Sequence, residues 1–188
     1  ARATFDGGSH DTFRGSLFGA AEHKGWSATG AYEGVRTDGA YIVASEARGS
    51  IDTKADSDYQ TGFGSAGWRG GNWHATFRAA GYKEERGNGT PVQVNSTDWQ
   101  QYSFEGGGLI GGGVLQAQTA ASNQDYYQTF SFVAASRATE RLTFEQFIDT
   151  RHNMVNGQWT RPLGRVTMIV GADYRRTAPD LFLPSSTI

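Results

Sequence analysis

The chain has 188 residues and a formal net charge of -2, which argues against the basic surface expected of a nucleic-acid-binding protein. Aromatic residues make up 13% of the chain, and this content with so little net charge is not typical of a disordered protein. There is no cysteine, so a disulfide framework and a thiolate site are excluded, and no apolar run is long enough for a transmembrane helix.

Apolar and polar residues alternate along most of the chain, and this period of two predicts β-strands. No segment shows a helical period, so the fold class is all-β, an antiparallel up-and-down meander. We expect about eleven strands, in chain order at residues 1–7, 12–21, 26–35, 58–69, 72–84, 99–110, 114–121, 126–135, 139–150, 157–163 and 165–176.

The segment NWHATFRAAGYKEERGNG, residues 72–89, shows the alternation most clearly. Trp73 and Phe77 fall on one face of the predicted strand, and His74 and Arg78 fall on the other. In a soluble sandwich the apolar face points into a core, whereas in a membrane barrel it points to lipid and the polar face lines a lumen. The periodicity alone leaves both arrangements open.

Short turns and longer polar loops alternate between the predicted strands. Tight turns are expected at residues 22–25, 70–71, 111–113, 136–138 and 163–165, and looser connections at 36–57, 86–98, 122–125 and 151–156. Short turns at one end and long loops at the other are typical of an outer-membrane β-barrel, and several predicted strands have the ~9 to 11 residues that cross a tilted bilayer.

If the strands cross a membrane, their charged side chains must face the lumen, because a charge facing lipid at the midplane costs roughly 2 to 4 kcal/mol. Eight charged or titratable residues are therefore candidates for the lumen wall and for ligand contact: Glu33, His74, Arg78, Glu105, Arg141, Glu145, Asp173 and Arg175. The side chains expected to face lipid are Trp73, Phe77, Phe130, Phe132, Leu142, Phe144, Met168 and Val170.

Catalytic and metal-binding patterns are weak. The four histidines are scattered without the i, i+4 spacing of a metal-binding pair, so we expect no metal site and no cofactor. The glycine-rich segment 106–113 lacks the lysine and following helix of a phosphate loop. No nucleophile elbow is present, so an enzyme is not expected.

Four stretches of the sequence resemble the first half of the barrel of bacterial TonB-dependent outer-membrane receptors. They are GGSHDTFRGSLFGAAEHKGWSATGAYEGVRTDGAYIV, EERGNGTPVQVNSTDW, YYQTFSFVAASRATERLTFEQF and QWTRPLGRVTMIVGADYRR. The resemblance covers nearly the whole chain and rests on stretches typical of barrel strands and turns, so it says little about the ligand.

The resemblance implies a 22-stranded barrel with short periplasmic turns, long outer loops and an amino-terminal plug domain in the lumen. Residues 1–188 then form a fragment of the barrel domain, without the plug and without the second half. The implied function is energy-coupled uptake of a scarce ligand, such as a metal chelate, cobalamin or an oligosaccharide. The implied partners are outer-membrane lipid, the plug and the TonB energy-coupling complex, and the implied location is the bacterial outer membrane.

The alternative is a soluble, secreted all-β binding module with its aromatic residues in a core. Ligand selection in the transport reading is expected in the long loops, above all residues 36–57 and 86–98, because loops on a rigid scaffold carry recognition.

Overall fold

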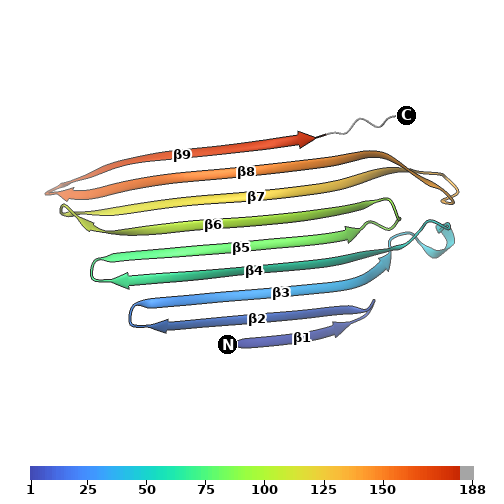
Figure 1. The fold of residues 1–188 in the computed structure, drawn as a ribbon, viewed down its shortest axis with the longest axis horizontal. Helices are drawn as coiled ribbons and strands as arrows, with labels where there is room; N and C mark the ends of the chain where they lie inside the picture. The colour runs from blue at the N-terminus through green and yellow to red at the C-terminus, as the bar shows by residue number, and fades with distance from the viewer. Residues whose placement is uncertain (183–188) are drawn as a thin grey trace.

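The structure, a computed structural model, describes residues 1–182 as one antiparallel sheet whose nine strands follow each other in chain order (Figure 1). The expected all-β meander is confirmed, and the only helix among the described residues is the single 3₁₀ turn Ser45–Ala47. The strands are β1 Arg2–Gly8, β2 Thr12–His23, β3 Trp26–Tyr41, β4 Lys54–Gly70, β5 Trp73–Gly87, β6 Val94–Ile110, β7 Gly113–Val133, β8 Glu140–Leu163 and β9 Val166–Phe182.

The expected number of eleven strands is wrong. Residues 122–125 and 151–156, predicted as loops, lie inside β7 and β8, which run unbroken for 21 and 24 residues. Ser122 pairs with His152 and Asp125 with Asp149 in the ladder between these strands. Polar residues on both faces removed the period of two there, although the backbone stays extended.

The connections divide between the two ends of the sheet. Two-residue turns at 24–25, 71–72, 111–112 and 164–165 lie at one end, which we call the short-turn end. Connections 9–11, 42–53, 88–93 and 134–139 lie at the other, the loop end (Figure 1). The expected division into short turns and long loops is confirmed only in part: the predicted tight turn at 136–138 belongs to the loop end, the connection 9–11 at that end is short, and the predicted loops 122–125 and 151–156 are strand.

The short turns have the backbone geometry that a two-residue hairpin needs. Gly111 and Gly112 both have positive φ, at 58° and 74°, as a type I′ turn requires. In the β8–β9 turn Gly164 has a φ of 67° while Arg165 does not have a positive φ, as in type II′.

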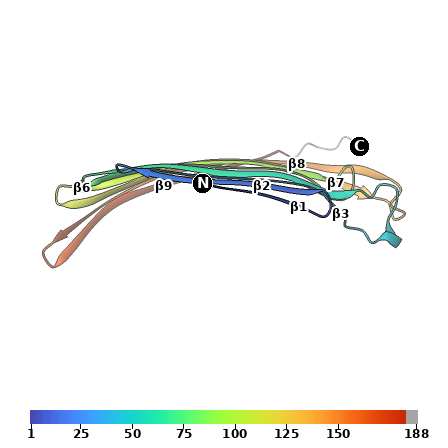
Figure 2. The same cartoon turned by 90° about the horizontal axis from the view of Figure 1, so that it is seen from below.

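The sheet is a single curved layer with no second layer against it (Figure 2). Among the described residues no hydrophobic side chain is buried, and many large ones are exposed, such as Phe77 at 47% and Val170 at 59%. No described helix is long and apolar enough to span a membrane. Because no described hydrophobic side chain is buried, neither face of the sheet supplies a hydrophobic core by itself.

Candidate functional surfaces

The pairing registers determine which residues share a face, because directly paired residues lie on the same side of a sheet and alternate residues lie on opposite sides. We name the two sides after adjacent residues of β5, the Phe77 face and the Arg78 face. Phe77 is paired with Ala66 of β4 and Phe104 of β6, whereas Arg78 is paired with Ser65 and Ser103.

The Phe77 face carries an apolar band next to the short turns. In each strand from β3 to β9 the nine residues nearest the turn present five side chains to this face. These segments are residues 26–34, 62–70, 73–81, 102–110, 113–121, 155–163 and 166–174. Arg161 is the one charged residue among the five positions of all seven segments, and the others are aromatic, aliphatic, Ala or Gly, with one Thr.

The next position on the Phe77 face is polar in all seven strands. These sixth positions are Arg36, Gln60, Lys83, Gln100, Asn123, Asn153 and Arg176. Farther toward the loop end, Asp98, Asp125, Asp149 and Asp180 follow one another across the paired strands. The band therefore ends at a sharp polar boundary, at the same distance from the turn in every strand.

Aromatic residues mark both borders of the band. Trp26, Trp68 and Trp73 lie on the Phe77 face near the short turns, and Tyr102 and Tyr174 lie on it beside the polar boundary, whereas Trp159 and Tyr32 lie farther inside the band. The rings of Trp26 and Trp68 are 6.4 Å apart between centroids. Arg161 is the second residue of β8 on this face, counted from the β8–β9 turn, and its guanidinium lies 5.9 Å from the ring centroid of Trp159.

The band runs obliquely to the strands. Trp26 pairs with Trp68, and the β4–β5 ladder continues two residues beyond that row to the pair Gly70 and Trp73. Likewise Trp73 pairs with Gly108, and the β6–β7 ladder continues two residues farther to Ile110 and Gly113. Each short hairpin thus projects two residues past the one before it, a stagger of about one residue per strand.

The Arg78 face carries charged pairs at the height of the band. Arg14 donates two hydrogen bonds to Glu33, of 2.5 and 3.0 Å, and the Tyr59 hydroxyl donates a third of 3.0 Å. Arg78 pairs with Glu105 at 2.9 Å. A polar hollow beside this pair is lined by Glu22, Ser27, Gly67, Arg69 and His74, among others. Phe18, Phe63, Leu109 and Ile169 are apolar exceptions on this face.

Six of the eight predicted lumen residues share this face: Glu33, His74, Arg78, Glu105, Asp173 and Arg175. Arg175 pairs with Asp173 at 3.0 Å. The expected face is wrong for Glu145, which lies on the Phe77 side, where it accepts a 2.7 Å hydrogen bond from Tyr127 and pairs with Thr129. Whether any of these residues contacts a ligand stays a prediction.

The expected lipid-facing set is divided by the same registers. Trp73, Phe77, Met168 and Val170 share the Phe77 face. Phe130 and Phe144 lie on the Arg78 face with rings 5.7 Å apart, so their assignment is wrong. Phe132 is paired with Arg141, and the two therefore share a side instead of opposing each other. Leu142 is paired with Ser131, next to the register shift that lies between Phe130 and Ser131 on β7 and between Phe144 and Leu142 on β8. All four lie at the loop end, far from the band.

The loops at the loop end are bound to one another. Arg137 in the β7–β8 connection donates to both carboxylate oxygens of Asp52 in the β3–β4 connection, at 2.9 Å each. The Asp52 side chain is only 1% exposed. The hydrogen bonds from Arg137 lower the pKa of Asp52, helped by a bond from the Gly49 N–H. Thr53 N–H donates to the Gly89 carbonyl at 3.0 Å, which ties in the β5–β6 connection.

Glu140, the first residue of β8, holds the β5–β6 connection. It accepts hydrogen bonds from the Thr90 hydroxyl at 2.5 Å, the Val92 N–H at 3.1 Å and the Ser131 hydroxyl at 2.5 Å. Thr129 adds bonds to the Val92 carbonyl and to the Val94 N–H. Thr90, Asn95 and Thr129 are the buried polar side chains of the described chain. Two of these three residues, Thr90 and Thr129, belong to the hydrogen-bonded network around the β5–β6 connection.

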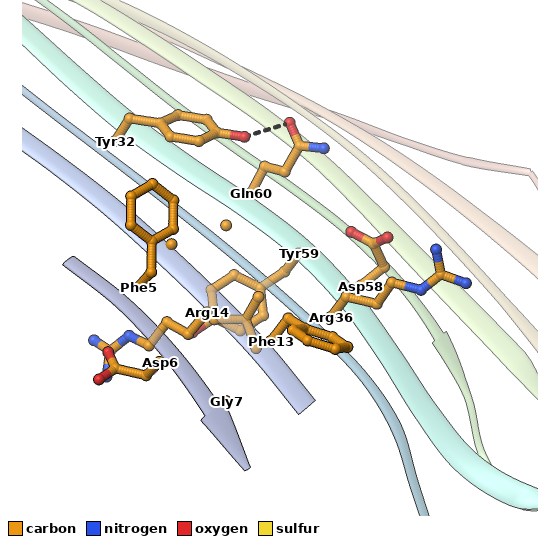
Figure 3. Close-up of a pocket in the computed structure, with 13 residues that line it drawn as sticks. Phe5, Asp6, Gly7, Phe13, Arg14, Tyr32, Arg36, Asp58, Tyr59 and Gln60 are labelled. Carbon is orange, nitrogen blue, oxygen red and sulfur yellow. Dashed lines mark hydrogen bonds between the residues drawn. The ribbon is translucent and has the colours of Figure 1, made fainter. Parts of the chain in front are cut away.

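A hollow of about 500 Å³ lies on the Phe77 face near the β1 edge (Figure 3). Gly15 and Gly34 form its floor between the rings of Phe5, Phe13 and Tyr32. Tyr32 donates a 3.0 Å hydrogen bond to Gln60 above the hollow. The hollow is open to the surroundings and contains no set of nucleophile, base and acid.

No group of three or more His, Cys, Asp or Glu residues in the described part of the chain is arranged to hold a metal ion. Comparisons with protein-family models, with curated proteins and with solved structures found no match for this chain. The surfaces themselves therefore carry the functional interpretation.

Proposed function

We propose that this chain forms part of the wall of an outer-membrane β-barrel, with the Phe77 face toward lipid and the Arg78 face toward the lumen. The observation that carries the proposal is the apolar band. In seven consecutive strands the first five residues on the Phe77 face are uncharged, with Arg161 as the one exception, and the sixth residue is polar. A segment of nine residues matches the ~9 to 11 needed for a tilted strand to cross a bilayer.

The borders and the tilt of the band support the same proposal. Membrane barrels have aromatic girdles at both interfaces, and here Trp26, Trp68 and Trp73 border one side of the band while Tyr102 and Tyr174 border the other. In a closed barrel the stagger per strand equals the shear number divided by the number of strands. A stagger of one residue per strand is therefore the value of an eight-stranded barrel with a shear number of eight, whose strands tilt by about 36°. That tilt falls in the range of roughly 35–45° found in membrane barrels.

The absence of buried hydrophobic side chains among the described residues gives no support to a soluble module that folds alone as a monomer. In a barrel, lipid covers the band, and further strands pair with the free edges of β1 and β9, which in the described sheet each pair on one side only. Unpaired edges otherwise invite association.

Within this class we propose an energy-coupled receptor of the TonB-dependent type, on the resemblance of the sequence. The bound loops at the loop end are placed to select a ligand outside the cell, and the charged pairs on the Arg78 face are placed to meet a plug domain. The plug, the energy-coupling complex and a scarce ligand are the partners this role requires. No enzymatic role is proposed.

The membrane part is tested by refolding the chain in lauryldimethylamine oxide micelles and in plain buffer. We expect β-sheet circular dichroism and a heat-modifiable band on electrophoresis in micelles only. A monodisperse β-sheet monomer in plain buffer contradicts the proposal and favours the soluble binding module.

The transport part is tested in cells that express the full-length protein, by uptake of a labelled ferric chelate, cobalamin or maltoheptaose. We expect uptake of one probe that stops when the inner-membrane energy complex is inactivated, and that weakens when residues 44–50 are deleted. A correctly inserted protein that takes up none of the three contradicts the receptor role but does not contradict the proposal that the chain forms part of a barrel wall.

A further inference from the structure

Four aromatic residues form a stripe on the Arg78 face, toward the loop end of the band. Tyr59, Tyr82, Trp99 and Tyr126 come from the consecutive strands β4 to β7, and we call them the aromatic stripe. Tyr82 is paired with Trp99, and Thr97, two residues before Trp99, is paired with Tyr126. Tyr59 and Tyr82 have ring centroids 6.1 Å apart and planes inclined by 32°. All four side chains are partly buried.

Neutral polar groups lie beside the stripe, and several of them have no partner among the described residues. The indole N–H of Trp99 and the side-chain amides of Gln101 and Gln124 make no hydrogen bond to another described residue, whereas Tyr126 donates to Gln128 at 2.6 Å. Gln124 is paired with Trp99 and Gln101 lies two residues beyond it, so both amides flank the indole. Unpaired donors and acceptors beside aromatic rings are what a small polar ligand needs for orientation.

The charged groups nearest the stripe are already paired. Glu33 is held by Arg14 and accepts a hydrogen bond from Tyr59, and Arg86 lies 3.9 Å from Glu84 and donates to Asn95. Within residues 1–182, no unpaired cation is therefore placed beside the rings to recognise an anionic ligand.

From this arrangement we propose that the aromatic stripe is a binding platform for an uncharged oligosaccharide. A pyranose ring offers a flat face of C–H groups that packs on an aromatic ring, and its hydroxyls exchange hydrogen bonds with amides and an indole N–H. The four strands span three spacings of about 4.8 Å, roughly 14 Å, so the stripe accommodates a short chain of sugars. This inference rests on the proposed function, since it places the stripe inside the lumen near its outer mouth.

The test is isothermal titration of the chain, refolded in lauryldimethylamine oxide, with maltoheptaose, cellohexaose and chitohexaose. This detergent is not a sugar, so it does not compete. Adjacent residues of β7 provide a matched control, because Tyr126 is in the stripe, whereas Tyr127 lies on the opposite face and donates to Glu145. Both side chains are partly buried.

We expect at least one of these probes to bind, and Trp99→Ala and Tyr126→Ala each to weaken its affinity about tenfold, the factor that corresponds to 1.4 kcal/mol. Tyr127→Ala should leave the affinity unchanged. Gln124→Ala, at an exposed side chain without a hydrogen bond, should fold normally and weaken binding less. Folding of each variant is verified by heat-modifiable migration.

Two results overturn the inference. One is a correctly folded chain that binds none of the three sugars, and the other is equal loss of affinity in the Tyr126 and Tyr127 variants. Either result is distinct from failure of the proposed barrel, because heat-modifiable folding in micelles is scored in the same samples without any ligand.

Discussion

The two halves of the sheet differ in how their faces are composed, although the backbone runs through both without a break. Near the short turns, the Phe77 face is apolar and the Arg78 face is polar. Toward the loop end both faces mix polar and apolar residues, and the buried polar side chains are Thr90, Asn95 and Thr129. The two faces therefore differ from each other in one half of the sheet and resemble each other in the other half. The polar boundary between them marks where a bilayer would end.

The largest expected effect comes from a charge at the middle of the band. Phe77 is the third of the five β5 positions, so Phe77→Arg places a cation near the bilayer midplane at a cost of roughly 2 to 4 kcal/mol. Insertion of the full-length protein should fail or be much reduced, measured by heat-modifiable migration. Thr76→Arg on the opposite face is the control and should insert normally. Normal insertion of both variants would remove the distinction between the faces.

The second effect concerns the loop half only. Glu140→Ala removes the acceptor of three hydrogen bonds, a loss of roughly 1.5 to 4.5 kcal/mol of local stability at ~0.5 to 1.5 kcal/mol for each bond. Amide exchange of Val92 and neighbouring residues of the β5–β6 connection should accelerate, while exchange in residues 73–81 stays the same. Faster exchange in both regions would mean that the halves are not independent.

A smaller and pH-dependent effect is expected at Asp52. Because Arg137 lowers the pKa of Asp52 in the folded state, the bridge stabilises the loops above the unfolded pKa of about 3.9 and is lost as pH falls through the folded pKa. Protection of the Thr53 and Ile51 amides, corrected for intrinsic exchange, should be level from about pH 7 to 5 and fall below about pH 4. In Asp52→Asn it should be low at all of these pH values. A wild-type pH profile retained in that variant would assign the effect to another group.

The smallest effect is expected at Arg161, the one charge within the band. It is the second residue of β8 on the Phe77 face, counted from the β8–β9 turn. Near the membrane interface a charge on a lipid face costs only about 0 to 1 kcal/mol, and the contact of Arg161 with Trp159 stabilises the fold by a similar amount. Arg161→Gln should therefore insert like the wild type and shift the unfolding midpoint in urea only slightly. A loss of insertion as large as that of Phe77→Arg would place Arg161 in a different role.

The two halves also differ in how far the sequence alone predicts them. In the band one face is apolar and the other mostly polar, which produces the period of two, so the sequence correctly predicts that Trp73, Phe77, Met168 and Val170 share a face. Where polar residues occupy both faces, as at residues 122–125 and 151–153, the period disappears, so the sequence predicts loops at 122–125 and 151–156 and divides two long strands.

Contacts between distant residues had no local signal. The faces of Phe130, Phe144 and Glu145 follow only from a register that continues unbroken through the polar half of β7 and β8. Asp52 and Arg137 are separated by 85 residues, and nothing near either residue predicts their bridge. The aromatic stripe likewise depends on the pairing of four strands. The sequence shows that its four residues are aromatic but not that they lie side by side.

The apolar band is tested most directly by a cysteine scan along β5. The chain has no cysteine, so each variant carries a single fluorescent label. Labels at Trp73, Ala75, Phe77, Ala79 and Gly81 should be quenched by brominated lipid, while labels at His74, Thr76 and Arg78 should be quenched only by a water-soluble quencher. From Lys83 onward both faces should respond to the water-soluble quencher alone. Lipid quenching at His74, Thr76 and Arg78, or no alternation between residues 73 and 81, would contradict the assignment of the Phe77 face to the membrane.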